Sequence, residues 1–249
     1  MYSPVTHIHS HRVADSPAAQ EAATEHQGEV VALVAIIEKT LSKEASPFWF
    51  PGWQGEIEAA LLDSVFAARA TYGGEGNGVR RVISRWREHR GDGPLDDLSV
   101  LASFVEAPHV LEELLGNRQR VAGNSTTKAE AAAKAAAALT EVGVVRSEDL
   151  ADADEDSHRY LAQARAFTSI TGVGYKTWRS LVYLAGGRDS EDSLLVQFVS
   201  NAIGEQVDEC GMLELMHCAA EELGTDSPTL QHALWRELRR PNTTKATAV

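Results

Sequence analysis

One short stretch of the chain combines residue types that could contact a phosphodiester backbone. Gly172, Val173 and Gly174 form a two-glycine turn between two apolar runs with helical spacing. Glycine has no Cβ, so such a turn lets the backbone come close to another backbone or to a phosphate. Lys176 follows in the first turn of the next predicted helix, where unpaired N–H groups and the helix dipole favour anions. The stretch therefore predicts a phosphate-binding turn.

A carboxylate follows the same predicted helix. The helix ends at Gly186 and Gly187, and Asp192 then begins another apolar run over residues 194–199. An N-terminal Asp is an ordinary helix cap, because its side chain accepts from free N–H groups. A carboxylate beside a sugar can also stabilise the charge that develops when an N-glycosidic bond breaks. Both roles are open for Asp192.

The order and spacing of these residues resemble the helix-hairpin-helix DNA glycosylase superfamily, which includes endonuclease III, the adenine-mismatch glycosylase and the 8-oxoguanine glycosylase. In that family a GVG-x-K hairpin is followed by a helix and then by an Asp that heads the next helix. The resemblance covers roughly residues 57–204 and is strongest at the hairpin. It implies a catalytic carboxylate at Asp192 and a lysine at Lys176 that is competent to form a Schiff base. The DNA-binding hairpin that it implies consists of Gly172, Val173, Gly174, Tyr175 and Lys176.

Lys176 has two candidate roles. If it is desolvated between two lobes its pKa should fall, so that the neutral amine could attack the sugar carbon and form an imine. The enzyme would then also cleave the strand as a lyase. Lys176 could instead contact a phosphate only, just as Asp192 could be only a helix cap.

The chain departs from the family pattern in ways that affect packing and cofactors. Trp178 stands where a small residue is usual, so we expect the packing behind the hairpin to differ. The cysteine quartet that holds the iron–sulfur cluster of endonuclease III is absent, so no cluster and no other cofactor is expected. The resemblance leaves one bound ion open, since hairpin carbonyls in this family often bind a monovalent cation.

Two upstream segments add candidates for DNA contact. Residues 66–71, FAARAT, resemble the LSAQAT-type segment of endonuclease III relatives, in which the Gln enters the gap left by an extruded base. Arg69 takes that place here, and a guanidinium can stack on and hydrogen-bond with the orphaned base. The predicted helix over residues 79–90 carries five arginines and one acid, and Arg80 and Arg81 are its expected phosphate contacts. Solvated arginines are the alternative for both segments.

Composition gives the main argument against a DNA-binding protein. The formal net charge is 23 − 36 = −13, and affinity for DNA usually rests on neutralising phosphates. Binding depends on where charge sits, however, and an acidic remainder can keep a protein in solution.

Cys210 and Cys218 are too few for a disulfide framework and are expected to be free, buried thiols. No apolar run suits a membrane helix and no signal-peptide core is present, so the expected location is the cytoplasm, associated with the nucleoid.

The hydrophobic periodicity predicts an all-α fold, since no segment shows a convincing alternating strand pattern. The resemblance implies two helical lobes with a cleft for DNA and a flipped base between them. Residues 56–187 would form a helical barrel that contains the hairpin, and residues 27–55 and 188–240 would form the second lobe. Residues 1–26 and 241–249 are predicted to be a disordered arm and tail.

Three other segments have more than one interpretation. His7, His9 and His11 alternate in the polar arm and could bind a metal, but no Cys, Asp or Glu stands among them, so no metal site is predicted there. Residues 46–53 hold an aromatic cluster that is either a plug between lobes or part of a pocket wall. Residues 147–157 are acidic and are expected to face away from bound DNA.

The expected function is base excision from double-stranded DNA that carries a damaged or modified base. A non-catalytic DNA-binding or scaffold protein of the same shape is the alternative, and an acidic helical interaction module that does not bind DNA is a third hypothesis. The excised base and the oligomeric state have no sequence signal, because the residues that shape a pocket are scattered along the chain.

Overall fold

The structure is a computed structural model that describes residues 17–42, 49–68, 77–151, 156–187 and 192–239, without the side chains of residues 17–23, 192 and 193. Its regular elements in these ranges are helices, and its β structure there is one isolated bridge between Arg120 and Thr127. The predicted all-α class is confirmed. None of the helices in these ranges is long and apolar enough to cross a membrane.

The described part of the chain holds eleven α-helices and one 3-10 helix. In chain order they are α1 (Pro17–Thr40), α2 (Ile57–Ala67), α3 (Gly78–Arg90), α4 (Leu98–Ala102), α5 (Pro108–Leu115), α6 (Lys128–Glu141), the 3-10 helix η2 (Ser147–Asp149), α7 (Ser157–Thr168), α8 (Tyr175–Leu184), α9 (Asp192–Ile203), α10 (Glu209–Glu222) and α11 (Ser227–Leu238).

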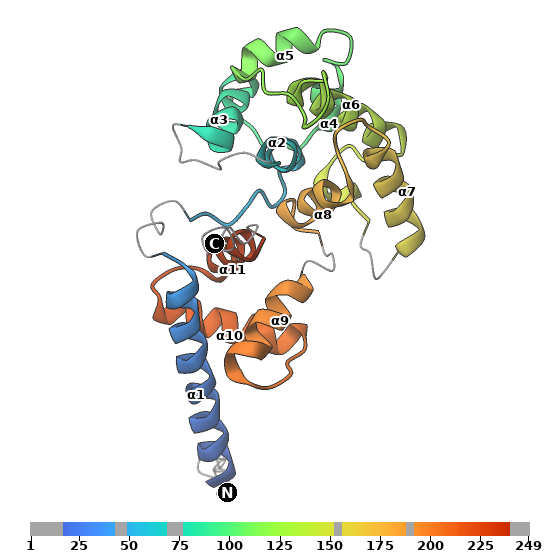
Figure 1. Cartoon of the computed structure of the whole chain (residues 1–249). Helices are drawn as coiled ribbons and strands as arrows, with labels where there is room; N and C mark the ends of the chain where they lie inside the picture. The colour runs from blue at the N-terminus through green and yellow to red at the C-terminus, as the bar shows by residue number, and fades with distance from the viewer. Residues whose placement is uncertain (1–16, 43–48, 69–76, 152–155, 188–191, 240–249) are drawn as a thin grey trace, which may run out of the picture.

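The helices pack in two groups (Figure 1). Helices α2 to α8 pack against one another and form the upper group in the figure. Helices α1, α9, α10 and α11 form the lower group, so segments from both ends of the chain build it together. Helix α11 lies between the rest of its group and helices α2 and α8, and it is the helix through which the two groups meet.

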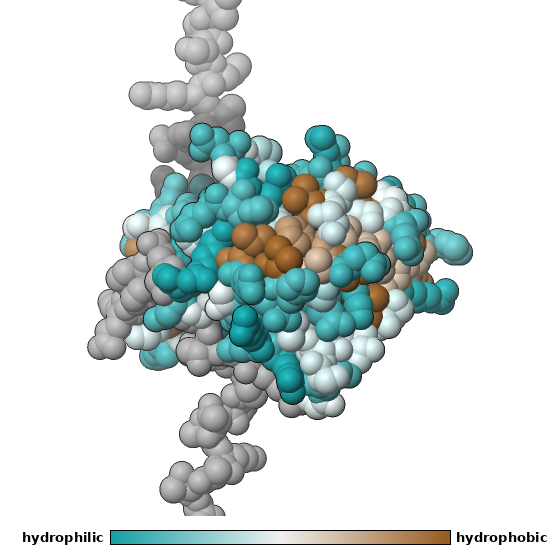
Figure 2. Space-filling view, turned by 90° about the horizontal axis from the view of Figure 1, so that it is seen from above, coloured by the Kyte–Doolittle hydropathy of each residue, from teal (hydrophilic) through white to brown (hydrophobic). Residues whose placement is uncertain are grey.

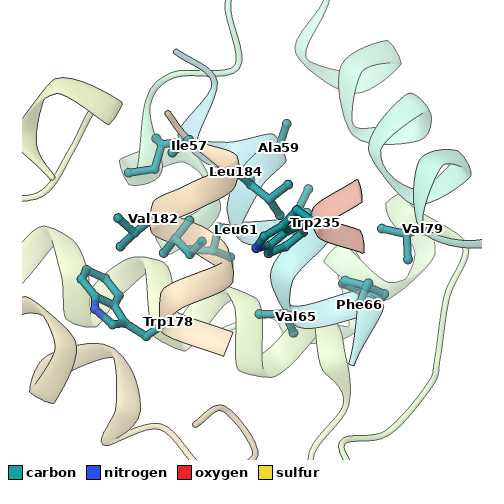
Figure 3. Close-up of a cluster of buried hydrophobic side chains, with 14 of the residues drawn as sticks. Ile57, Ala59, Leu61, Val65, Phe66, Val79, Trp178, Val182, Leu184 and Trp235 are labelled. Carbon is teal, nitrogen blue, oxygen red and sulfur yellow. The ribbon is translucent and has the colours of Figure 1, made fainter. Parts of the chain in front are cut away.

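Helix α2 is the centre of the upper group. All ten residues from Ile57 to Phe66 are buried, because α3, α4, α6 and α8 surround the helix. Figure 3 shows apolar side chains of α2 beside Val79 of α3, Trp178 and Leu184 of α8, and Trp235 of α11. An apolar surface on every side is typical of a helix that is covered on every side. The helices around α2 are therefore held in place because each of them covers part of its buried surface.

A fully buried carboxylate on α2 fixes the position of α3. Glu58 has no exposed surface and accepts hydrogen bonds from Trp86 Nε1 at 2.7 Å and from the Arg90 guanidinium at 3.0 and 3.1 Å. The backbone N–H of Asp97 donates to the same carboxylate at 2.9 Å. Hydrogen bonding to Glu58 raises the pKa of Arg90. A buried charge with this many partners is tolerated, but it becomes costly to the fold when one partner is removed.

Replacing Glu58 with Ala should lower the free energy of unfolding by about 3 kcal/mol or more, because the indole N–H and the guanidinium would lose their buried acceptor. Urea denaturation followed by circular dichroism measures this change. Glu88→Ala is the matched control, since Glu88 is exposed on α3 and its removal should change stability by less than about 0.5 kcal/mol. Equal losses in the two variants would mean that the Glu58 network contributes no stability.

The structure corrects two expectations about less central parts of the chain. Helix α1 begins at Pro17, so residues 17–26 are helical where a disordered arm was predicted. Their alanines and glutamates favour a helix, and proline suits its first turn, although no apolar stripe marks it. Both cysteines are free as predicted, but the prediction that they are buried is wrong: Cys210 is exposed and Cys218 is half-buried.

The upper group shows a mostly hydrophilic face in the view from above, with an apolar area at its middle (Figure 2). Large apolar side chains that are exposed in the described part of this group are Val110, Val142, Leu161 and Tyr175. They come from four different segments of the chain. Tyr175 differs from the others because it lies beside Lys176 at the predicted hairpin.

Candidate nucleic-acid interface

The predicted hairpin is a tight turn over residues 169–174 between α7 and α8. Gly172 has φ +93°, and a Cβ there would lie 2.4 Å from Cγ2 of Val121. Only glycine fits such a backbone conformation and such a close contact. Val173 is buried, and its N–H donates to the Ile170 carbonyl at 3.2 Å. The turn is therefore anchored on the loop that carries Val121.

The N-terminal end of α8 offers backbone donors to an anion. Gly174 is the extended N-cap residue, and no side chain caps this end of the helix. The Gly174 carbonyl accepts from the N–H groups of Thr177 and Trp178, while the N–H groups of Tyr175 and Lys176 lie in the first turn ahead of them. Both Tyr175 and Lys176 are exposed. Exposed first-turn N–H groups with a lysine beside them have the properties of a phosphate site.

Trp178 fills the space between the two hairpin helices. Its side chain has no exposed surface, and its ring centroid lies 5.6 Å from the rings of both Tyr160 and Phe167 on α7. Packing of this kind buries a large apolar area and holds the helices at a fixed separation. The packing behind the turn is thus aromatic.

Lys176 lies beside a second cation, which comes from α11. The Arg239 guanidinium donates to the Lys176 carbonyl at 3.2 Å and to Ser180 Oγ at 2.5 Å, and it lies 4.6 Å from the ring centroid of Trp235. Arg239 was not among the predicted site residues, although the LRR run at the end of the last apolar segment was a usable signal. Because Lys176 is exposed, this structure does not contain the desolvation on which the imine hypothesis for Lys176 depends.

Arg80 links α3 to α11 at His232, seven residues before Arg239. Its guanidinium lies 4.9 Å from the ring centroid of Phe50, and that ring lies 4.5 Å from the His232 ring on α11. Arg81 is exposed on the next position of α3. The two arginines expected to contact phosphates thus lie on the part of α3 that is linked through Phe50 to α11.

The basic surface of α3 is smaller than its five arginines suggest. Arg87 forms a bidentate ion pair with Glu56, and Arg90 is bound by Glu58. Arg85 lies against Gly116, where a Cβ would overlap its guanidinium. These three arginines contact α2, its N-cap residue and the end of α5, so they are part of the fold.

A pocket of about 290 Å³ lies at the other end of α8, between the two helix groups. Helices α8 and α11 are antiparallel, because Arg239 meets Ser180 near the start of α8 while Trp235 stacks on Tyr183 near its end. The segment before α2, the end of α8 and α11 line the pocket, among others with Gly52, Tyr183, Gly187, Gln231 and His232.

His232 is the buried polar group of this pocket. Its Nδ1 is 2.8 Å from the Phe50 carbonyl, so the neutral ring donates there and leaves Nε2 as an acceptor. Nε2 is buried and has no hydrogen-bond partner. The Cδ2 edge of the ring faces Gly52, where a Cβ would lie 3.8 Å away. Burial lowers the pKa of His232 to about 3, and the nearby Arg236 charge adds to this shift.

The aromatic segment before α2 serves both of its predicted uses. Phe50 and Trp53 pack against each other at 5.0 Å, and Trp53 Nε1 donates to the buried Asp63 carboxylate at 2.7 Å. Pro51 and Gly52, between the two rings, line the pocket. The segment is therefore a plug between the groups and a pocket wall.

Two predicted site residues cannot be placed by their side chains. Asp192 is the first residue of α9, as expected for a helix start, but its side chain is outside the described part. Arg69 also lies outside the described residues. The end of α2 that precedes it is held by Lys128, whose buried Nζ donates to the carbonyls of Phe66 and Ala68 at 2.9 and 3.0 Å. Burial lowers the pKa of Lys128.

The described part of the acidic loop packs beside α7. The Asp149 carbonyl accepts from Arg159 and Gln163, which lie nine and five residues before Thr168, the last residue of this helix. Residues 152–155 of the loop lie outside the described residues, so the expectation that the loop faces away from bound DNA stays a prediction.

A family model matches residues 31–239, which include both helix groups, the hairpin and the pocket. The chain belongs to the family described as Domain of unknown function (DUF8548). No curated protein and no solved structure matches the chain. The description of DUF8548 assigns no activity, so a function for this member rests on the geometry given above.

The buried His232 should make the protein less stable in acid. Its folded pKa of about 3 lies below the ordinary value of 6.5, so the unfolded chain binds a proton that the folded chain excludes between these values. Stability is therefore complete above about pH 6.5 and falls as the pH decreases. Between about pH 7.5 and pH 5 the free energy of unfolding should decrease by roughly 2 kcal/mol more in the native protein than in His232→Gln.

Urea denaturation at the two pH values measures this difference. The glutamine amide can still donate to the Phe50 carbonyl but does not titrate, so other groups contribute equally to both proteins. Equal decreases would show that His232 is protonated in the folded state.

Proposed function

We propose that this DUF8548 protein is a DNA base-excision glycosylase, which binds double-stranded DNA and cleaves the N-glycosidic bond of a flipped damaged or modified base. The observation that carries the proposal is the glycine turn anchored on Val121, which presents the uncapped start of α8 with Tyr175 and Lys176 exposed. The helix-hairpin-helix glycosylases have a GVG-x-K turn of this kind, and the same match implies the two-lobed arrangement with the cleft between residues 56–187 and the chain ends.

Local charge supports DNA binding in spite of the net charge of −13. The proposed phosphate contacts are the first-turn N–H groups of α8, Lys176, Arg80 and Arg81, and Arg239 joins Lys176 from α11. Arg69 would enter the gap left by the flipped base. The electrostatic part of DNA affinity comes from counterions released at the phosphates that the protein contacts, and here these are few. A small cationic surface can therefore bind DNA when the acidic residues lie elsewhere.

The pocket between the helix groups is the proposed site for the flipped base. Its volume of about 290 Å³ is near the lower end for ligand sites, which suits a single ring system. Tyr183 offers an aromatic surface, and Gln231 offers an amide that can donate and accept. His232 Nε2 is an acceptor, so the proposed base presents an N–H group to it. An acceptor that is buried and unpaired discriminates strongly in favour of a ligand that satisfies it.

Asp192 is the proposed catalytic carboxylate at the start of α9. It would stabilise the oxocarbenium-like sugar or activate the attacking water. We assign Lys176 to phosphate contact because it is exposed, and imine formation with strand cleavage is the competing outcome in the test below. No iron–sulfur cluster is proposed, and the hairpin carbonyls are candidate ligands for a monovalent cation.

A non-catalytic DNA-binding protein is the second candidate function. The observation that favours it is the exposure of Lys176, because imine formation calls for a lysine that is desolvated in the active site. Such a protein would use the same hairpin and the same cations.

Replacing Lys176 with Ala should weaken binding to an abasic-analogue duplex by about three- to tenfold and reduce the salt dependence by about one released counterion. Fluorescence anisotropy at several salt concentrations measures both quantities. Lys134→Ala removes the same charge from α6, where Lys134 pairs with Glu130, and should leave binding unchanged. If the native protein does not bind the duplex at low salt, both DNA-binding functions are wrong.

Base release from a panel of damaged-base duplexes tests the catalytic proposal. Asp192→Asn should reduce release by at least about a hundredfold while duplex binding is kept, because the carboxylate acts on the transition state. Gln231→Trp should fill the pocket and abolish release, also without loss of binding. We expect no borohydride-trapped adduct, and an adduct that is lost in Lys176→Ala would reassign Lys176 as the nucleophile. Binding without release of any base would favour the non-catalytic function.

A further inference from the structure

We propose that Cys218 is a nucleophilic thiol that His26 and Glu29 activate toward hydroperoxides. Cys218 lies on α10 and His26 on α1, and 192 residues of sequence separate them. The fold brings Cys218 Sγ to 3.7 Å from His26 Nε2. The other ring nitrogen, Nδ1, lies 3.6 Å from a carboxylate oxygen of Glu29, one turn further along α1. A thiol, an imidazole and a carboxylate are thus arranged in series.

This order of groups is the one that activates a cysteine. The imidazole accepts the thiol proton, and the carboxylate on the far side of the ring orients the ring and stabilises the imidazolium that forms. The distances are longer than those of tight hydrogen bonds, as is common for such groups without a bound substrate. Because His26 comes from α1 and Cys218 from α10, the arrangement depends on the packing of these two helices.

The site is open enough for a small reagent. Cys218 is half-buried, and the side chains of His26 and Glu29 are 38% and 28% exposed. It lies in the helix group formed by the chain ends, on α1 and α10, whereas the candidate DNA contacts lie on α3, α8 and α11. The activity proposed for Cys218 is therefore independent of base excision.

The second cysteine provides an internal comparison. Cys210 is exposed on the same helix, and no hydrogen bond or ion pair joins it to another group in the described part of the chain. Eight residues separate the two cysteines along α10, which corresponds to about 12 Å. Cα atoms further apart than about 7 Å cannot be joined by a disulfide without backbone movement. The two thiols therefore react separately. Cys218 has the neighbouring imidazole, whereas Cys210 is more exposed and lies in the first turn of α10.

The reaction consumes one hydroperoxide. The Cys218 proton passes to His26 Nε2, and the thiolate sulfur attacks the nearer peroxide oxygen. The S–O bond forms as the O–O bond breaks, and the departing oxygen takes the proton back from the imidazolium. With hydrogen peroxide the products are a sulfenic acid at Cys218 and one water molecule; sulfur is oxidised by two electrons and the peroxide is reduced.

The test uses the full-length protein, hydrogen peroxide and a dimedone trap, with mass spectrometry of the peptides that contain each cysteine. Cys218 should form the sulfenic acid adduct about tenfold faster than Cys210 despite its lower exposure, because His26 lies where it can accept the Cys218 proton during the attack. His26→Gln should reduce the Cys218 rate to about that of Cys210, and Glu29→Gln should reduce it severalfold. The Cys210 rate should stay the same in both variants.

Two further measurements separate activation from a change in folding. Added imidazole should restore part of the Cys218 rate in His26→Ala, because it replaces the missing base without repairing any packing. In urea the two cysteines should react at the same rate in every variant. Oxidation that follows exposure, with Cys210 faster than Cys218 in the folded protein, or a Cys218 rate that His26→Gln leaves unchanged, would overturn the proposal. Loss of DNA binding or base release would not affect it.

Discussion

The burial of α2 on all sides is the constraint on which the rest of the structure depends. Its two buried carboxylates must be hydrogen-bonded, and their partners come from different parts of the chain. Glu58 binds Trp86 and Arg90 of α3, while Asp63 binds Trp53 of the segment that leads into α2. Satisfying these acids fixes α3 and the aromatic segment at once. The segment in turn carries Phe50 and Gly52 to α11, where they become part of the pocket.

Helix α11 joins the candidate binding features, which lie at its two ends. Arg239 at one end contacts the backbone of Lys176, and Gln231 and His232 at the other end line the pocket. Trp235 between them stacks on Tyr183 of α8. Because α8 and α11 run antiparallel, a ligand that bound both the hairpin and the pocket would lie along these two helices. This arrangement supports a single extended site more than two unrelated ones.

The acidity of the chain and its proposed affinity for DNA are compatible because charge is distributed unevenly. Some arginines serve the fold: Arg87 and Arg90 neutralise acids of α2. Asp149 of η2 accepts from Arg159 and Gln163 of α7 through its carbonyl. Screening by salt confines the effect of each charge to its neighbourhood, so cations near α8 can attract an anion although the whole chain is acidic.

The sequence by itself determined the helical class, most helix positions and the glycine turn, because apolar periodicity, caps and glycine act over a few residues. It also identified Lys176, Arg80 and Arg81 as cations near apolar helices. Tertiary structure alone decided that Lys176 is exposed, that Arg239 adjoins it and that His232 is buried with an unpaired nitrogen. The same holds for His26 and Cys218, whose contact joins opposite ends of the chain. Burial and long-range contacts depend on the packing of whole helices, which no local pattern encodes.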